Sequence, residues 1–311
     1  MISIRWADWG LTAPQALRPV SGGLINASFC ANWDDGSQRF VQQVNRSVFA
    51  NLESMEHNLR LVADSAAATL AVLPERRRDG AIHSPEGWRT FPWVQARPEA
   101  ASPAQLGVFW GRFNAELNRE LLEWDTVLPD FHSARTRYAQ WCAVRHQVAT
   151  AHADVARELE AWSEEYIGFE AELAPGVQHH DAKRSNVILS DLGLKAVDLD
   201  TLQPGYLGSD FGDLVRSVAA LRDEDDPKGN GVDATDFESL WLGYSGAFPE
   251  ATTRAEQVRA MPAYLTWIQA LRFATDAASG RMYYPESYPG HTWVRARNQL
   301  QLHESLTRFL R

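Results

Sequence analysis

Residues that could carry out chemistry gather in one short stretch, His179 to Asn186, and in one acid that follows it. The stretch has the pattern H-x-D-x-x-x-x-N, and Asp198 ends the next apolar strand. Phosphoryl transfer needs a carboxylate near the acceptor hydroxyl, and it needs amide and carboxylate oxygens that hold Mg²⁺ against the phosphates. We therefore predict that Asp181 is the catalytic base and that Asn186 and Asp198 bind Mg²⁺, although both residue types are also common in ordinary turns.

Other polar residues around this stretch are predicted to have supporting roles. His179 is expected to support the loop structurally, and His180 to be an exposed neighbour. The string Ser209-Asp210-Phe211-Gly212 spells the D-F-G of protein kinases but lies far beyond the H-x-D pattern. We therefore predict that Asp210 is a buried anchor that hydrogen-bonds the catalytic loop. For Asp200, assistance to the metal and a solvated turn position both remain open.

The elements that precede the stretch predict a small sheet with one helix. Strands are expected at 25–32 and 39–44, joined by the tight-turn signal Asp34-Asp35-Gly36. A helix with apolar residues at helical spacing is expected at about 52–68, and another strand at 88–94. Pro92 and the polar run 95–102 then mark a lobe boundary, which gives an N-terminal lobe of residues 1–94 and a C-terminal lobe of residues 95–311.

The C-terminal lobe is predicted to be mostly helical. Between its helices, a loop at 179–186 leads into a hairpin with strands at 187–189 and 194–199. The helices are expected at 103–122, 135–169, 237–248, 261–279 and 291–310.

Composition excludes several classes of protein. Of the 311 residues, 45% are apolar and 23% are charged, which is typical of a globular protein. The net charge of -10 argues against binding to nucleic acid, which relies on Lys and Arg. Cys30 and Cys142 support neither a disulfide framework nor a zinc site. With no signal peptide and no apolar run long enough to span a membrane, we expect a cytoplasmic protein, monomeric or homodimeric, that acts on a small molecule.

Several further groups of residues, together with the H-x-D pattern, resemble the aminoglycoside phosphotransferase and choline kinase-like superfamily, and most closely its N-acetylhexosamine 1-kinase branch. The resemblance runs nearly end to end. It is carried in chain order by Gly22 to Phe29, Val44 to Phe49, Gly111 to Phe113, Leu128 to His132, Asp198 to Gly205, Asp210 to Arg216, Leu271 to Asp276 and Tyr283-Tyr284.

This resemblance implies an α+β, bilobal protein-kinase-like fold, with a small antiparallel sheet in the nucleotide-binding N-terminal lobe and a mostly helical C-terminal lobe. It also implies ATP and Mg²⁺ as cofactors, with Asp181 next to the acceptor. A nucleotide site is implied at Ser21, Gly22, Gly23, Asn26, Gln43, Phe91, Trp93 and Val94.

Acceptor contacts are implied by the same resemblance at Arg272 and Tyr283. The plainer interpretation of Arg272 is a surface ion pair with Asp276 on the same helix, and that of Tyr283 is an ordinary packed tyrosine. The segment Phe91 to Val94 would lie beside the adenine, although a buried strand has the same composition.

One departure from the family pattern concerns the nucleotide site. The strand at 39–44 carries Gln42 and Gln43 where such enzymes place a Lys or Arg against the phosphates. Gln43 could donate an amide hydrogen bond instead, and Lys183 or Arg184 could lend charge. An acidic partner on the following helix is equally undecided, with Glu53 and Glu56 as candidates.

The function expected from these features is transfer of the ATP γ-phosphate to a hydroxyl of a sugar, with the anomeric hydroxyl of an N-acetylhexosamine preferred. A kinase of aminoglycosides, amino alcohols or another hydroxylated metabolite is the rival, as is a catalytically weak nucleotide-binding module.

Overall fold

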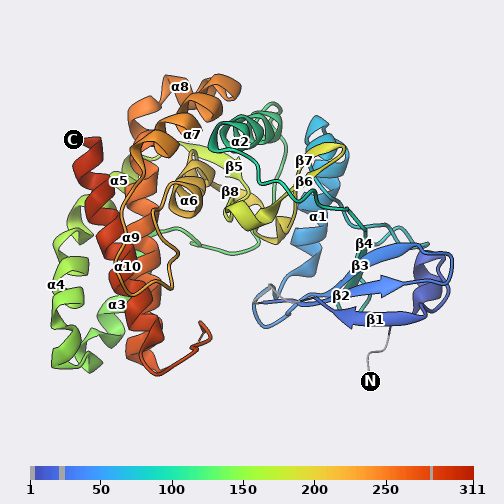
Figure 1. Ribbon diagram of the computed structural model, residues 1–311, viewed down its shortest axis with the longest axis horizontal. Helices are drawn as coiled ribbons and strands as arrows, with labels where there is room; N and C mark the ends of the chain where they lie inside the picture. Colours follow the sequence, from blue (N-terminus) through green and yellow to red (C-terminus); the bar gives the residue numbers. More distant parts are fainter. Residues whose placement is uncertain (1–3, 21–24, 281–282) are drawn as a thin grey trace. The chain divides into compact units, whose positions relative to one another are not determined.

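A computed structural model describes residues 4–20, 25–280 and 283–311 of the chain. The chain forms two compact units, which are distinguished by their secondary structure (Figure 1). The first comprises the described residues up to Ala100 together with Arg119–Leu128 and Ser185–Gln203, and the second comprises the remaining residues. The boundary between lobes predicted after Val94 stays a prediction.

An antiparallel sheet of four strands is the centre of the first unit. Its strands are β1 (Ala16–Pro19), β2 (Ala27–Asn32), β3 (Gln38–Gln43) and β4 (Trp88–Pro92), in the spatial order β1-β2-β3-β4. Gly36 closes the β2–β3 turn with a φ of 81°, a conformation that glycine adopts without strain. Ala31, Val41 and Trp88 form the buried face, against which Trp6, Trp9 and Trp33 pack.

Helix α1 (Leu52–Ala63) follows the sheet in the first unit. Its Asn51 cap accepts the N–H of Ser54, and its buried face carries Met55, Leu59 and Val62. The helix ends before the predicted residue 68 because Ser65 caps a separate 3₁₀ helix, Ala66–Leu70. The unit is completed by the hairpin of β6 (Val187–Ser190) and β7 (Gly193–Ala196).

The second unit is mainly helical. Its helices are α2 (Pro103–Leu117), α3 (Ala134–Val144), α4 (Ala153–Ala161), α5 (Ser163–Glu172), α6 (Ser209–Val218), α7 (Ala234–Ala247), α8 (Pro249–Thr253), α9 (Ala255–Ser279) and α10 (His291–Leu310). A two-stranded sheet pairs β5 (Pro175–Gln178) with β8 (Gln203–Tyr206). Together with the sheet of the first unit, this confirms the predicted α+β class.

Helices α2 and α7 cross in very close contact because glycines line both of them. A Cβ on Gly111 would lie 2.4 Å from the carbonyl oxygen of Tyr244, and one on Gly107 would lie 2.4 Å from that of Leu240. Gly243 faces the backbone of α2 in the same way. The crossing therefore depends on the absence of side chains at these positions.

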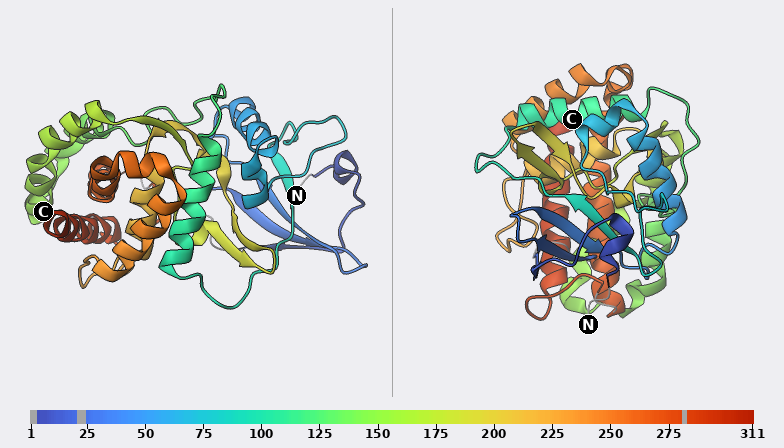
Figure 2. Two further views of the ribbon diagram at one scale, coloured as in Figure 1. Left: turned by 90° about the horizontal axis from the view of Figure 1, so that it is seen from above. Right: turned by 90° about the vertical axis from the view of Figure 1, so that its right-hand side faces the viewer.

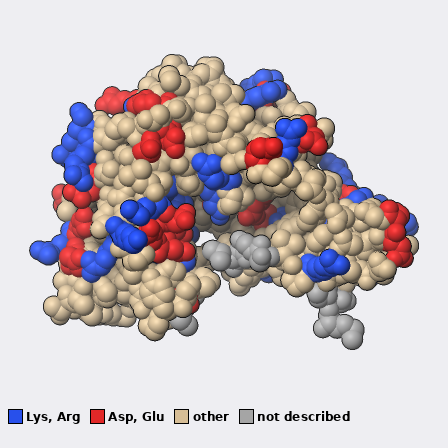
Figure 3. All heavy atoms as spheres, viewed as in Figure 1, with Lys and Arg blue, Asp and Glu red and all other residues tan. Residues whose placement is uncertain are grey.

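Helices α9 and α10 pack along each other and supply much of the core of the second unit (Figures 1 and 2). Of the helices within the described ranges, none combines the length and apolar character that a bilayer crossing would require. On the face in Figure 3, basic and acidic side chains lie close together over the helical unit. Ion pairs such as Arg295 with Asp225 and Arg297 with Asp154 join this unit's outer segments.

Several features of the second unit differ from the sequence prediction. The single helix predicted at 135–169 is divided into α3, α4 and α5, because the chain turns between α3 and α4 so that both pack on α9. The turn contains Val148 and Thr150, which are weak helix formers. Helix α6 and the short strands β5 and β8 were not predicted, and β1 was missed in the first unit.

Candidate active site

The open end of the β6–β7 hairpin in the first unit holds both predicted metal ligands. The register pairs Val187 with Ala196, and the carbonyl oxygen of Asn186 accepts the N–H of Val197 at 3.0 Å. Asn186 therefore begins one arm of the hairpin, and Asp198 directly follows the other. An amide oxygen and a carboxylate at one hairpin end are a donor set that suits Mg²⁺, which takes its remaining ligands from phosphates and water.

The backbone of Asp198 has an unusual conformation. Its φ of 60° and ψ of 53° are left-handed, which is uncommon for a residue other than glycine. A short 3₁₀ helix, Leu199–Thr201, starts immediately after it. Backbone strain of this kind persists only where neighbouring contacts enforce it, and it is enriched at functional sites.

Asp200, in the middle of that 3₁₀ helix, is buried and paired with Arg89 of β4. Its side chain is 3% exposed and that of Arg89 is 1% exposed, and the two guanidinium contacts measure 2.6 and 2.7 Å. Arg89 Nε also donates to Gln42 Oε1 at 3.1 Å. Burial raises the pKa of Asp200, but Arg89 and the amide of Asn26 lower it by more, so that this pKa lies below its ordinary value. The interpretation of Asp200 as a solvated turn residue is therefore wrong.

The predicted nucleotide-binding residues that the structure describes belong to the first unit. Ser21, Gly22 and Gly23 lie outside the described residues. Asn26 donates to Asp200 Oδ2 at 2.8 Å and accepts the N–H of Asn45 at 2.9 Å. Gln43 Nε2 donates to the carbonyl oxygen of Glu86 at 3.1 Å.

The segment predicted to lie beside the adenine is at the end of β4. Phe91 is half-buried and its ring centroid lies 5.8 Å from that of Phe40. Trp93 is an exposed large apolar residue, and Val94 is half-buried. Their roles in binding stay predictions.

The stretch that carries Asp181 is anchored within the second unit. It leaves β5, and the backbone N–H groups of His179 and His180 donate to the carboxylate of Asp210 at 2.9 and 2.7 Å. Asp210 is fully buried at the start of α6. The predicted anchoring role of Asp210 is confirmed. Asp181 itself forms an ion pair of 2.8 Å with Lys183.

The two histidines before Asp181 are both buried. His179 packs against the ring of Trp110 with a centroid separation of 5.0 Å, as expected of a structural support. His180 has a left-handed φ of 64°, and its Nδ1 lies 3.3 Å from Nδ1 of His132. A Cβ on Gly205 would lie 2.2 Å from the His180 ring, so the imidazole is packed against backbone. The prediction that His180 is exposed is wrong.

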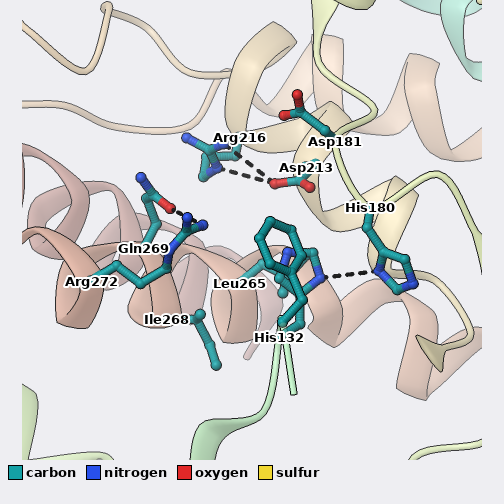
Figure 4. A pocket seen from close by; sticks show the side chains of 10 residues that line it. His132, His180, Asp181, Asp213, Arg216, Leu265, Ile268, Gln269 and Arg272 are labelled. Atoms are coloured by element: carbon teal, nitrogen blue, oxygen red, sulfur yellow. Dashed lines mark hydrogen bonds and ion pairs between the residues drawn. The ribbon is translucent and has the colours of Figure 1, made fainter. Parts of the chain in front are cut away.

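A small cavity of about 30 Å³, partly open to solvent, lies beside Asp181 in the second unit (Figure 4). Its lining residues come from the loop before α3, from the stretch at 179–184, and from α6 and α9. They are Phe131, His132, His180, Asp181, Asp213, Arg216, Leu265, Ile268, Gln269 and Arg272.

Charge in this cavity is balanced and partly neutralised. Burial raises the pKa of Asp213 to about 6, although Arg216, with contacts of 3.3 and 3.4 Å, acts to lower it. Arg216 also pairs with Glu224 at 3.1 Å. Burial and the neighbouring His180 keep the pKa of His132 well below its ordinary value, so His132 is neutral at pH 7.

Arg272 is part of the cavity wall, whereas Tyr283 is not among the lining residues. The Arg272 guanidinium carbon lies 5.0 Å from the Phe131 ring centroid and 5.7 Å from that of Tyr284, and Nη1 donates to Gln269 at 3.1 Å. Asp276 accepts the backbone N–H groups of Tyr283 and Tyr284 at 2.7 and 3.0 Å. Within the described chain, no ion pair is formed between Arg272 and Asp276, so that interpretation of Arg272 is wrong.

Sequence reasoning assigned no site role to Arg89, Asp213, Gln269 or His132. Asp213 and His132 lie in groups that carried the family resemblance, so a signal for them was present. Gln269 lies on the same helix face as Arg272, at the i,i+3 spacing. Arg89 had no local signal, because its contacts reach Gln42 and Asp200, which are distant in sequence.

Several known structures with the same fold are described as kinases or phosphotransferases. An aminoglycoside phosphotransferase from Alicyclobacillus acidocaldarius is 13% identical, with 100% of this chain and 94% of that chain covered and a TM-score of 0.66. Amicoumacin kinase hAmiN, in complex with AMP-PNP, Ca²⁺ and Ami, is 11% identical, with 94% and 89% covered and a TM-score of 0.64. A choline/ethanolamine kinase family protein from Mesorhizobium loti is 16% identical, with 96% and 92% covered and a TM-score of 0.62.

At these identities the structures establish the fold, and membership of a family rests on the sequence match. The sequence model described as "Phosphotransferase enzyme family" matches residues 16–242. This range includes Asp181, Asn186 and Asp198. Since the match covers well over half of the chain, the protein belongs to the phosphotransferase enzyme family and is an ATP-dependent phosphotransferase with a hydroxyl acceptor.

Proposed function

We propose that this enzyme transfers the γ-phosphate of ATP to a hydroxyl of a sugar, and that its acceptor is an N-acetylhexosamine phosphorylated at the anomeric hydroxyl. The observation that carries the proposal is the cavity that Asp181 borders, whose lining includes amide, guanidinium and aromatic groups. Such a lining can hydrogen-bond several hydroxyls and a carbonyl while one face of the ring packs on an aromatic side chain.

Asp181 is the proposed catalytic base, which accepts the proton of the attacking hydroxyl. Its side chain borders the cavity and forms an ion pair of 2.8 Å with Lys183. The buried Asp210 holds the two preceding backbone N–H groups and thereby orients Asp181. Orientation of this kind is a large part of phosphoryl-transfer catalysis, because the transition state needs little covalent assistance.

Asn186 and Asp198 are the proposed metal ligands, and the end of the hairpin that they share supports the assignment. A bound Mg²⁺ would neutralise charge on the phosphates during transfer. AMP-PNP and Ca²⁺ accompany the similar fold of amicoumacin kinase hAmiN, which supports ATP and a divalent metal as the cofactors of this chain. Lys183 and Arg184 remain proposed sources of positive charge for the phosphates.

The charges in the cavity favour a neutral acceptor over a cationic one. Choline-like and aminoglycoside acceptors need aromatic faces or unpaired carboxylates for their positive groups. Here the guanidinium of Arg272 already lies near the rings of Phe131 and Tyr284, and Asp213 is paired with Arg216. An amino alcohol or aminoglycoside acceptor is therefore the weaker candidate.

A catalytically weak nucleotide-binding module is the remaining rival, since β3 carries Gln42 and Gln43 in place of a cation. The complete set of Asp181, Asn186 and Asp198, together with the cavity beside Asp181, favours an active enzyme.

A screen of ADP release tests the proposal. The purified protein is supplied with ATP and Mg²⁺ and with N-acetylhexosamines, simple hexoses, amino alcohols or aminoglycosides, and the phosphorylated position is assigned by ³¹P NMR. We expect the largest kcat/KM with an N-acetylhexosamine and a phosphate on its anomeric oxygen. A preference for an amino alcohol or aminoglycoside would overturn the proposed acceptor class. If no compound in the panel stimulated ADP release, the proposed sugar kinase activity would be overturned and a hydrolase or a weak nucleotide-binding module would be indicated.

A further inference from the structure

A buried cluster in the first unit joins segments that are far apart in the sequence. At its centre is the guanidinium of Arg89 on β4, which contacts the carboxylate of Asp200, the amide oxygen of Gln42 on β3 and, at 3.5 Å, the sulfur of Met55 on α1. Asn26 completes the cluster by donating to Asp200 Oδ2 at 2.8 Å. We call Arg89, Asp200, Gln42, Asn26 and Met55 the Arg89 cluster.

The cluster includes Gln42, one of the two glutamines that stand on β3 where the family pattern has a Lys or Arg. Gln42 and Arg89 are directly paired in the β3–β4 register, so the positive charge absent from β3 is present on the adjacent strand. Helix α1 contributes a methionine sulfur to this charge. The acidic residue that follows Met55, Glu56, accepts hydrogen bonds from Arg60 and from the N–H of Ile82, and it also contacts His83. Burial raises the pKa of Glu56, but these three contacts lower it by more, to about 2.

Arg89 holds Asp200 by two parallel contacts. A guanidinium that grips both oxygens of a carboxylate fixes the plane of that carboxylate as well as its position. Asp200 is the middle residue of the 3₁₀ helix Leu199–Thr201, which begins directly after Asp198. The left-handed backbone of Asp198 thus precedes a turn that is locked by Arg89, and such a conformation needs an enforcing contact.

Stability alone does not account for a pair of this kind. Removing two charges from water is costly, and well-packed apolar residues often replace a buried ion pair without loss of stability. A buried pair next to a proposed metal ligand is instead the arrangement that orients a ligand from behind.

We propose that Arg89 is a positioning residue that sets the affinity for the Mg²⁺–nucleotide complex. It holds Asp200 in place and, through Asp200, the adjacent Asp198. Arg89 lies on β4, whereas the family pattern places its cation on β3. Arg89 is too buried to contact a phosphate directly, so its effect passes through Asp200. This inference rests on the proposed function, because it presumes that Asp198 binds the metal.

The test uses three variants of the full chain. Arg89→Gln removes the charge, Arg89→Lys keeps the charge but loses the two-pronged grip, and the double variant Arg89→Met with Asp200→Leu replaces the pair by apolar side chains. For each, ATP affinity is measured by calorimetry with and without Mg²⁺, together with the melting temperature and the KM of the acceptor.

We expect the enhancement of ATP affinity by Mg²⁺ to fall about 10- to 100-fold in Arg89→Gln and in the double variant, as is typical when the support behind a metal ligand is removed. Arg89→Lys should show a smaller loss, and the KM of the acceptor should change little. Arg39→Gln is the matched control, since Arg39 on β3 pairs with Glu75 at 2.8 Å in a partly exposed site. It should leave the effect of Mg²⁺ unchanged.

The inference would be overturned if the double variant had the melting temperature of the wild type and Mg²⁺ enhanced its ATP affinity as much as it does in the wild type. Should Arg89→Gln and the double variant fail to fold, an unchanged effect of Mg²⁺ in Arg89→Lys would overturn it in the same way. Failure of the proposed function is a separate result, because it would appear in the wild type as the absence of Mg²⁺-dependent ATP binding and of ADP release.

Discussion

The carboxylate of Asp210 accepts the backbone N–H of His180 at 2.7 Å, and its other oxygen holds the N–H of His179. His180 has a left-handed backbone and precedes Asp181 directly. The conformation of the loop at the proposed base is thus fixed by a carboxylate on another helix, which is fully buried. Burial raises the pKa of Asp210 to about 7 although both N–H groups act to lower it, and burial likewise raises that of Asp213 to about 6.

The raised pKa of Asp213 predicts a pH-dependent effect of Asp213→Asn on stability. Between the ordinary value of 3.8 and the folded value of about 6, the folded state binds more protons than the unfolded state, so rising pH costs the wild type stability. Asparagine carries no such cost. The free energy of unfolding of Asp213→Asn should therefore increase relative to that of the wild type as pH rises from about 4 to 7, by up to roughly 3 kcal/mol.

Urea unfolding of both proteins at several pH values measures this difference. The difference is the informative quantity, because buried His83, His132 and His303 have lowered pKa values and make both proteins less stable as pH falls. A difference in the free energy of unfolding that stays constant with pH would contradict the prediction.

Asp181→Asn should reduce kcat by about 10²- to 10⁴-fold, the usual contribution of a general base. Asparagine keeps the shape of the side chain but cannot accept the proton. ATP affinity and the melting temperature should stay near those of the wild type, and Asp191→Asn, an exposed partner of Arg97, is the matched control. Turnover retained in Asp181→Asn would rule out this residue as the base.

Asp198→Ala should abolish the enhancement of nucleotide binding by Mg²⁺, because a proposed metal ligand is lost. Calorimetric titration with ATP in the presence of Mg²⁺ or of EDTA measures the effect. Asn186→Ala should give the same kind of loss, since both residues share one end of the hairpin. If either variant binds ATP as the wild type does at every Mg²⁺ concentration, that residue is not a ligand.

Features that follow from local spacing could be predicted from the sequence. The anchoring of the loop before Asp181 by Asp210 followed from the motif, as did the hairpin that begins after Asn186. The roles of Asp181, Asn186 and Asp198 stay predictions. Contacts between distant segments could not be predicted in this way. The pairing of Arg89 with Asp200 depends on the register of β4 and on the turn after β7, and neither can be read from periodicity.

The burial of single side chains could not be predicted reliably from the sequence either. His180 was expected to be exposed because its own segment is polar, but Gly205 lets a distant strand approach its ring. For the fold, long amphipathic helices such as α10 were predicted almost to the residue. The region 135–169 was not, because the packing of α3 and α4 on α9 overrides a continuous helical pattern.

Gly111→Ala should destabilise the second unit, whereas Gly246→Ala should not. An added Cβ at Gly111 would lie 2.4 Å from the Tyr244 carbonyl oxygen, and backbone cannot move as a flexible side chain can. Overpacking of this kind costs about 1–3 kcal/mol. At Gly246, on α7, nothing lies within 4 Å, so alanine should add about 0.5–1 kcal/mol through its helix propensity. Thermal unfolding compares the two, and equal melting temperatures would contradict the close crossing of α2 and α7.

Arg272→Met should raise the KM of the acceptor about 10-fold or more while changing the KM of ATP little, because a lost charge-assisted hydrogen bond is worth roughly 1.5–3 kcal/mol. Methionine keeps much of the length of the side chain, so packing near Phe131 and Tyr284 is largely retained. Arg308→Met, on the exposed end of α10, is the matched control and should behave as the wild type.

Arg272→Met also tests the charge argument for the acceptor. Without the Arg272 guanidinium, the rings of Phe131 and Tyr284 are open to a cation, so choline should inhibit Arg272→Met more strongly than the wild type. Equal inhibition of both proteins by choline, with an unchanged KM for the sugar, would mean that Arg272 does not select the acceptor.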